Sequence, residues 1–194
     1  MSTSEEPVAP RRKRADALRN TETVLSAAKA IFAESGVDAP MRDIAMRAGV
    51  GVGTIYRNYP QRSDLIIAVF RSAVDATAAE AERLHGEHPP AEALRLWAAR
   101  FGRFIATKRG LASALHSGDP AYRPLPSYFL GTLAPPVQKI LDAGARDGTL
   151  RDDVRAEDLI HALTRLIGGP ADAEDRTSRM AEILLDGLTA SRPE

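Results

Sequence analysis

The sequence predicts an all-α protein with a small N-terminal unit followed by a larger helical unit. Apolar residues recur at helical spacing along most of the 194 residues, and no segment alternates like a strand with comparable strength. Gly and Pro residues separate the helical stretches. This length is enough for one small domain and one of ordinary size.

Composition and charge exclude several classes of protein. The chain has no Cys, which excludes disulfides and cysteine-ligated zinc, and its formal net charge is zero. Residues 7–62 nevertheless contain ten Lys or Arg against five acids, a net charge of +5. This concentration of positive charge is expected of a phosphate-binding segment.

The chain shows no sign of a membrane or secretory destination. No apolar run approaches the roughly 18 residues that span a bilayer, and the first ten residues lack the hydrophobic region of a signal peptide. We therefore expect a cytoplasmic protein without a membrane partner.

Residues 1–14 are predicted to be a disordered basic arm. The first ten are rich in Ser, Glu and Pro, and the basic run 11–14 follows them. This run could reach a minor groove or nearby phosphates, or it could be a solvated tail, and the sequence favours neither. A helix is then expected from Asp16 or Asn20, both of which can cap it, to Gly36.

The stretch from Ala39 to Leu65 predicts two short helices joined by a tight turn. Pro40 suits the first helical position, and Gly49 can form a left-handed cap. The inward face of the first helix is formed by Met41, Ile44, Ala45 and Ala48. The second helix is expected from Val52 to Tyr59, before Pro60, with Val52, Ile55 and Tyr59 inward. Residues 15–65 would form a three-helix DNA-binding domain of the helix-turn-helix type.

The outward residues of this stretch carry groups suited to DNA. Arg57 and Asn58 can reach base edges, and Thr54 can touch a thymine methyl or a phosphate. Phosphates can be held by three further side chains, those of Arg42, Tyr56 and Arg62. The full predicted DNA-binding set is Arg42, Gly51, Val52, Gly53, Thr54, Tyr56, Arg57, Asn58, Tyr59 and Arg62. A plain helical hairpin is the alternative, but a short helix with Arg, Asn and two Tyr is a poor core element.

Several motifs in the first third of the chain resemble a known family. They are Ile44-Ala45, Ala48-Gly49-Val50, Gly53-Thr54-Ile55-Tyr56 and Tyr59-Pro60-Gln61-Arg62-Ser63-Asp64-Leu65, with Gly148 to Val154 as a weaker match. Together they resemble the signature of the TetR family of bacterial transcription repressors. Two residues depart from it, since the family often has Ser in place of Gly51 and Lys in place of Arg62. The resemblance implies a sequence-specific regulator that a small-molecule ligand releases from a palindromic operator.

Residues 66–194 are expected to be a helical regulatory and dimerisation domain. Ser63 would cap a helix that runs to Leu84 and links the two domains. Further helices are predicted over 91–107, 110–116, 128–133, 137–147, 157–167 and 174–188, with a loop over 118–126. Pro135 and Pro136 are expected to break the chain between two of them.

The resemblance implies a small-molecule pocket in this second domain. Aromatic and apolar residues crowd into its middle, and most of them must simply form the core. The candidate lining residues are Trp97, Phe101, Phe104, Leu115, His116, Tyr122, Tyr128, Phe129, Leu133, His161 and Arg165. The sequence does not indicate which effector they bind.

The last two helices are predicted to form a homodimer interface. Both carry apolar residues on more than one face, so the surplus face needs a partner or a neighbouring helix of the same chain. The candidate interface residues are Leu159, Leu163, Leu166, Ile167, Met180, Ile183, Leu184 and Leu188. A two-fold dimer predicts a roughly palindromic operator.

The sequence gives little support for catalysis, a cofactor or a metal. Gly49, Gly51 and Gly53 do not have dinucleotide-loop spacing, and a helix precedes them where a strand is required. His85 and His88 have ligand-like spacing, but they lie at an expected helix end. An α-helical enzyme is therefore only the runner-up.

Overall fold

The computed structural model describes residues 10–108, 111–115, 117–167 and 174–189. The described residues are mostly helical, as predicted, and their only strand-like pairing is an isolated bridge between Leu150 and Thr189. The chain divides into two compact units between Val69 and Phe70, close to the predicted boundary after Leu65. None of the described helices is both long and apolar enough to cross a membrane.

The first unit contains three helices and the start of a fourth: α1 (Pro10–Ser35), α2 (Met41–Ala48), α3 (Val52–Asn58) and α4 (Arg62–Glu87). Helix α1 begins earlier than the predicted caps, so residues 11–14 belong to a helix rather than preceding one. Pro10 suits a first helical position, and the Arg, Lys, Ala and Leu residues after it have good helix propensity. Residues 1–9 of the predicted arm lie outside the described residues.

The core of the first unit confirms the predicted face of α2. Helix α2 packs on α1, and its four predicted inward residues are all buried. Ile55 is the only residue that α3 buries. Val52, which was predicted to face inward, is 42% exposed. It occupies the first position of a seven-residue helix, where the chain has only just left the turn.

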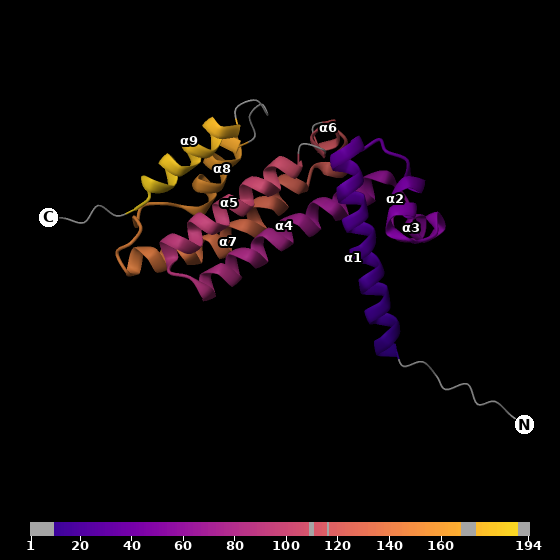
Figure 1. Cartoon of the computed structure of the whole chain (residues 1–194), viewed down its shortest axis with the longest axis horizontal. Helices are drawn as coiled ribbons and strands as arrows, with labels where there is room; N and C mark the ends of the chain where they lie inside the picture. The colour runs from indigo at the N-terminus through magenta and orange to yellow at the C-terminus, as the bar shows by residue number, and fades with distance from the viewer. Residues whose placement is uncertain (1–9, 109–110, 116, 168–173, 190–194) are drawn as a thin grey trace, which may run out of the picture. The chain divides into compact units, whose positions relative to one another are not determined.

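The second unit is a group of packed helices: the rest of α4, α5 (Pro90–Lys108), α6 (Ala112–Leu115), α7 (Leu125–Arg146), α8 (Ala156–Ile167) and α9 (Glu174–Asp186). Helix α5 packs on α7 and α8, and α8 packs on α9 (Figure 1). The segment predicted as a loop contains a 3-10 turn, η2 (Pro120–Tyr122), which the Asp119 carboxylate caps by accepting from the Ala121 amide at 2.9 Å.

The core of the second unit is rich in aromatic rings. Trp97 is fully buried, and its indole nitrogen donates to the Thr77 carbonyl at 3.1 Å. Trp97 stacks on Phe101 with ring centroids 5.0 Å apart. Phe129 on α7 lies 6.1 Å from Phe104 and 6.4 Å from Phe70. These rings tie α4, α5 and α7 together.

The predicted break at Pro135 and Pro136 is wrong, because α7 continues through both residues. A proline inside a helix removes an N–H donor and crowds the carbonyl four residues earlier. Here Leu133, Pro136 and Val137 are all buried along α7. Packing of this apolar face overrides the local preference of the two prolines.

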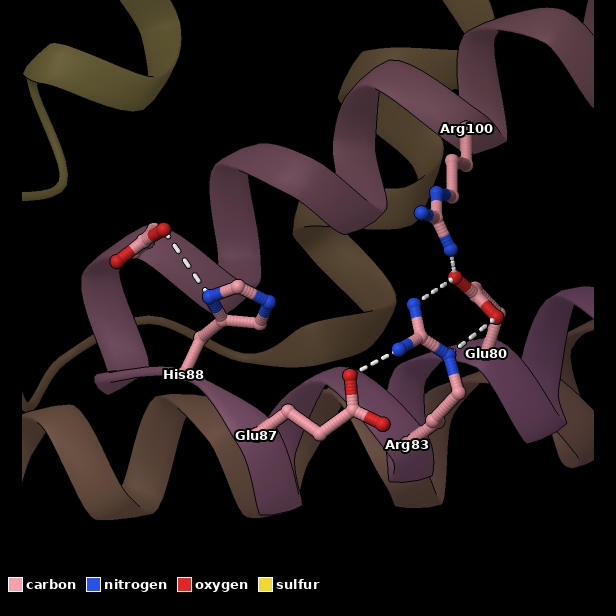
Figure 2. A network of polar contacts seen from close by, with 6 residues as sticks. Glu80, Arg83, Glu87, His88 and Arg100 are labelled. Atoms are coloured by element: carbon pink, nitrogen blue, oxygen red, sulfur yellow. Dashed lines mark hydrogen bonds and ion pairs between the residues drawn. The ribbon is translucent and has the colours of Figure 1, made fainter.

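An ionic network joins the end of α4 to α5 (Figure 2). Arg83 lies between Glu80 and Glu87 on α4, and Arg100 on α5 reaches the same Glu80. His88, one of the two histidines with ligand-like spacing, lies 3.0 Å from Glu92. The charged residues at this helix end therefore form ion pairs within the protein.

The connection from α7 to α8 folds back onto Gly144. The amides of Thr149 and Leu150 both donate to the Gly144 carbonyl, at 2.9 and 3.0 Å. A Cβ added at Gly144 would lie 2.4 Å from Leu150 Cδ1 and 2.8 Å from Leu150 Cβ. Leu150 is buried, so it has little room to move.

We predict that Gly144→Ala lowers the free energy of unfolding by about 1 to 3 kcal/mol through overpacking. Gly131→Ala is the matched control, because it lies on the same helix with no atom within 4 Å of the added Cβ. Alanine there should stabilise the helix by roughly 0.5 to 1 kcal/mol. Urea unfolding followed by circular dichroism measures both. Equal stability of Gly144→Ala and wild type would contradict the close contact.

Candidate functional site

The turn between α2 and α3 occupies residues 49–51 and depends on a left-handed glycine. Gly49 has a φ of +66°, a conformation that a side chain disfavours. The Val50 amide donates to the Ala45 carbonyl at 3.0 Å and the Gly49 amide to the Met46 carbonyl at 3.2 Å. These bonds satisfy the last carbonyls of α2. The chain can therefore start α3 almost at once, as predicted.

Helix α3 exposes most of its residues to solvent. Gly51, Val52, Gly53, Tyr56, Arg57 and Asn58 are exposed, and Thr54 is half-buried. The Tyr56 residue is 49% exposed. Tyr59, just after α3, is half-buried, and burial raises the pKa of its phenol above the ordinary value. The face predicted to meet DNA is thus open in this unit.

The two predicted base-reading side chains are bonded to their own helix. Arg57 donates from Nε to the Gly53 carbonyl at 3.1 Å and from Nη2 to the Thr54 hydroxyl at 3.2 Å. Asn58 donates from Nδ2 to the Thr54 carbonyl at 2.8 Å. These local bonds hold both side chains along the exposed surface of α3.

The arginines of α2 have different surroundings. The Arg42 side chain is 82% exposed, and its Nε lies 3.4 Å from Asp43, a long contact that leaves most of its donors to solvent. Arg47 instead approaches both carboxylate oxygens of Glu34 on α1 at 2.8 Å. Arg42 is therefore open to a phosphate, whereas Arg47 ties α2 to α1.

The structure gives Arg62 a role that the sequence analysis missed. Its Nη1 donates to the Val37 carbonyl and, at 2.7 Å, to the Ala39 carbonyl. These carbonyls belong to the segment between α1 and α2, and Arg62 is half-buried. Arg62, which was predicted to hold a phosphate, thus links the start of α4 to the segment before α2 through hydrogen bonds.

The predicted Ser63 cap of α4 is wrong. The Asp64 carboxylate accepts from the Gln61 amide at 2.8 Å, while the Ser63 hydroxyl lies 3.4 Å from the Gln61 side chain. Gln61 therefore stands at the cap position. Asp64, at the third position of the helix, accepts from the Gln61 amide as the acidic residue of a capping box does.

A cavity of about 450 Å³ lies in the second unit. Its lining residues are Phe70, Leu115, Tyr122, Leu125, Pro126, Phe129, Leu130, His161, Thr164 and Arg165. Five of the predicted pocket residues are among them: Leu115, Tyr122, Phe129, His161 and Arg165. The volume lies in the range of small-molecule sites.

The lining residues that the sequence analysis missed come mainly from two helix faces. Leu125, Pro126 and Leu130 lie on the same face of α7 as the predicted Phe129. Thr164 lies beside Arg165 and one turn after His161 on α8. Helical periodicity groups each set, but it does not indicate that the two sets face the same cavity.

The other predicted pocket residues do not line this cavity. Trp97, Phe101 and Leu133 are fully buried in the core, and Phe104 stacks on Phe129. Tyr128 donates its hydroxyl to Asp75, and this bond, followed by desolvation, raises the pKa of the phenol. His116 lies outside the described residues.

The predicted interface residues fall into two groups. Leu159, Leu163 and Leu188 are buried within the chain itself, so they belong to its own core. Met180 is 45% exposed and Ile183 is 70% exposed, while Leu166, Ile167 and Leu184 are half-buried. One face of α8 and α9 thus supplies the core, and the other remains accessible among the described residues.

Comparison with known families covers both units. Residues 24–69 match the family described as bacterial regulatory proteins, tetR family. Residues 89–190, more than half of the chain, match the family described as the C-terminal domain of SbtR-like transcriptional regulators. This chain belongs to the TetR family. It is a DNA-binding transcriptional regulator with a helix-turn-helix in its first unit.

Solved structures of TetR-family proteins resemble almost the whole chain. The regulator SCO0520 from Streptomyces coelicolor is 35% identical, with a TM-score of 0.74 over 88% of this chain and 99% of that one. A TetR-family protein from Mycobacterium vanbaalenii is 35% identical, with a TM-score of 0.72 over 91% of this chain and 99% of that one.

A curated relative of the helix-turn-helix type matches a shorter stretch. The transcriptional repressor LfrR from Mycolicibacterium smegmatis is 37% identical over 75 residues. That match spans 39% of this chain and 39% of the repressor, well under two thirds of its length. TetR-family regulators are generally not enzymes.

We predict that Arg62→Ala lowers the free energy of unfolding of this TetR-family chain by about 1.5 to 3 kcal/mol, the usual value of hydrogen bonds to a charged group. Arg42→Ala is the control, because the exposed Arg42 makes only a long contact to Asp43. Thermal unfolding of both variants measures the difference. A melting temperature of Arg62→Ala equal to that of Arg42→Ala would show that the two carbonyl contacts contribute nothing.

Proposed function

We propose that this chain is a repressor that binds a roughly palindromic operator and is released by a small-molecule ligand. The observation that carries the proposal is the construction of α3. This seven-residue helix follows a tight glycine turn, is anchored by Ile55 alone and leaves its remaining faces open. Such a helix can enter a major groove, where it meets base edges.

The side chains around α3 suit two kinds of contact with the operator, to base edges and to phosphates. Arg57 and Asn58 can exchange their bonds within the helix for acceptors on base edges. Tyr56 and Arg42 are exposed and suit phosphate oxygens. Arg62 already holds two carbonyls, so its main effect on DNA affinity would come from positioning α4 against the segment before α2.

Gly53 gives independent support for close approach of DNA to α3. Glycine inside a helix costs roughly 0.5 to 1 kcal/mol relative to alanine. Gly53 does not have a positive φ, and an added Cβ would meet no atom within 4 Å. Neither the backbone nor the packing of the described residues requires glycine here. A DNA strand against this face of α3 would require it, because glycine lets a ligand approach the backbone closely.

We predict that Gly53→Ala keeps or raises thermal stability and weakens operator binding by at least roughly tenfold, a loss of about 1.4 kcal/mol. Gly131→Ala makes the same chemical change on α7 and should raise stability without altering operator affinity. Thermal melting and fluorescence polarisation on the same preparations separate the two effects. Operator affinity of Gly53→Ala equal to that of wild type would remove this support.

We predict that Arg57→Ala and Asn58→Ala each cost about 1 to 3 kcal/mol at particular base pairs and relax the choice of base there. Tyr56→Phe and Arg42→Ala should weaken binding to all sequences, since phosphate contacts carry no direct sequence information. The measurement is titration against single-base variants of the fragment that wild type selects from a genomic library. If no fragment is enriched at moderate salt, the chain is not a sequence-specific regulator.

A homodimer through α8 and α9 is part of this proposal. Met180 and Ile183 on α9 are accessible, and Leu166, Ile167 and Leu184 are half-buried, so both helices leave apolar surface that a partner can cover. Two such helices from each subunit can form a four-helix interface about a two-fold axis. That symmetry requires two half-sites about one helical turn or a little more apart.

Release by a ligand requires coupling between the cavity and α3. The continuous helix α4 crosses the division between the units, which makes it the candidate link. A ligand changes operator affinity only if it binds one spacing of the two α3 helices better than another. A loss of about 1.4 kcal/mol per subunit would weaken dimer binding about a hundredfold. A regulator controlled only by its own abundance is the alternative.

A further inference from the structure

The cavity of the second unit has an apolar floor. Phe70, Tyr122, Leu125 and Phe129 are buried, and they present three aromatic rings and a leucine to the cavity. Such a surface favours an apolar chain or ring, because removing apolar area from water is favourable.

The mouth of the cavity is polar on the side of α8. His161 and Arg165 are exposed lining residues one helical turn apart, so they stand where the cavity meets solvent. The Thr164 hydroxyl between them already donates to the Ile160 carbonyl at 2.7 Å. Hydrogen-bond donors for a ligand at this edge therefore come from the imidazole and the guanidinium.

These donors lack acidic partners among the described residues. Neither His161 nor Arg165 makes a hydrogen bond or ion pair there, and no Asp or Glu lines the cavity. The nearby Glu157 pairs instead with Arg155 at 3.0 Å. A guanidinium at the edge of an apolar cavity attracts an anion and opposes a cation, and its planar fork matches a carboxylate.

We propose that this cavity binds a small organic acid, with an apolar chain or ring on the floor and one carboxylate at Arg165 and His161. The proposal rests on the function above only in taking this cavity as the effector site. It specifies the charge of the ligand, which neither the fold nor the family determines.

Two matched sets of compounds test whether the cavity prefers a negatively charged ligand. The first is octanoate, octan-1-ol and octylamine, and the second is 2-naphthoate, 2-naphthol and 2-naphthylmethylamine. Titration calorimetry of the full chain without DNA should show that one or both acids bind at least roughly tenfold more tightly than the alcohol and amine of the same skeleton, as a charge-assisted hydrogen bond implies.

Substitutions at Arg165 test whether this residue causes the preference for the acid. Arg165→Gln should lower the affinity for the acid by roughly tenfold and leave the affinity for the matching alcohol unchanged, because only the charge-assisted bond is lost. Arg165→Glu should reverse the order, so that the amine binds more tightly than the acid. Arg155→Gln is the control, since this exposed arginine before α8 does not line the cavity. It should bind all compounds like wild type.

Three results would overturn the proposal: failure of both acids to bind at millimolar concentration, an amine that binds wild type as tightly as its acid, or equal effects of Arg165→Gln on acid and alcohol. Because these titrations contain no DNA, they fail or succeed independently of operator binding. Acid binding without operator selection would contradict the repressor proposal alone, and operator selection without acid binding would contradict this one alone.

Discussion

The left-handed turn at Gly49 is the constraint on which the first unit depends. Its positive φ ends α2 and lets the Val50 amide reach the Ala45 carbonyl, so α3 can begin at Val52. A residue with a Cβ at Gly49 would be strained in this conformation even though the surrounding space is open. A longer connection would separate α3 from the core that Ile55 enters. The exposure of α3 is therefore a consequence of this backbone turn.

The same unit divides its arginines between structure and surface. Arg47 and Arg62 hold α2 and α4 to neighbouring segments through Glu34 and through backbone carbonyls, respectively. Arg42 stays exposed, and within the described part of the chain the hydrogen bonds of Arg57 go to residues of its own helix. Positive charge in the first third of the chain is thus divided between exposed side chains and contacts that hold the helices together. This explains why net charge alone could not distinguish the two roles.

Local patterns were enough to predict α2, the glycine turn and most of the exposed residues of α3. The inward residues of α2 follow from helical spacing, and the cap follows from a glycine after the last periodic residue. Contacts distant in sequence were not predictable in this way. The carbonyls that Arg62 binds lie more than 20 residues earlier. Helix α7 continues through Pro135 and Pro136 because of packing, and the cavity joins faces of α7 and α8 that no local pattern connects.

The central claim is that two copies of α3 read one operator together. A hydroxyl-radical footprint of the purified chain on its best genomic fragment tests this most directly. The account predicts two symmetric protected segments on one face of the duplex, centred about one helical turn or a little more apart. A single asymmetric segment, or weak protection that is the same on any sequence, would contradict it.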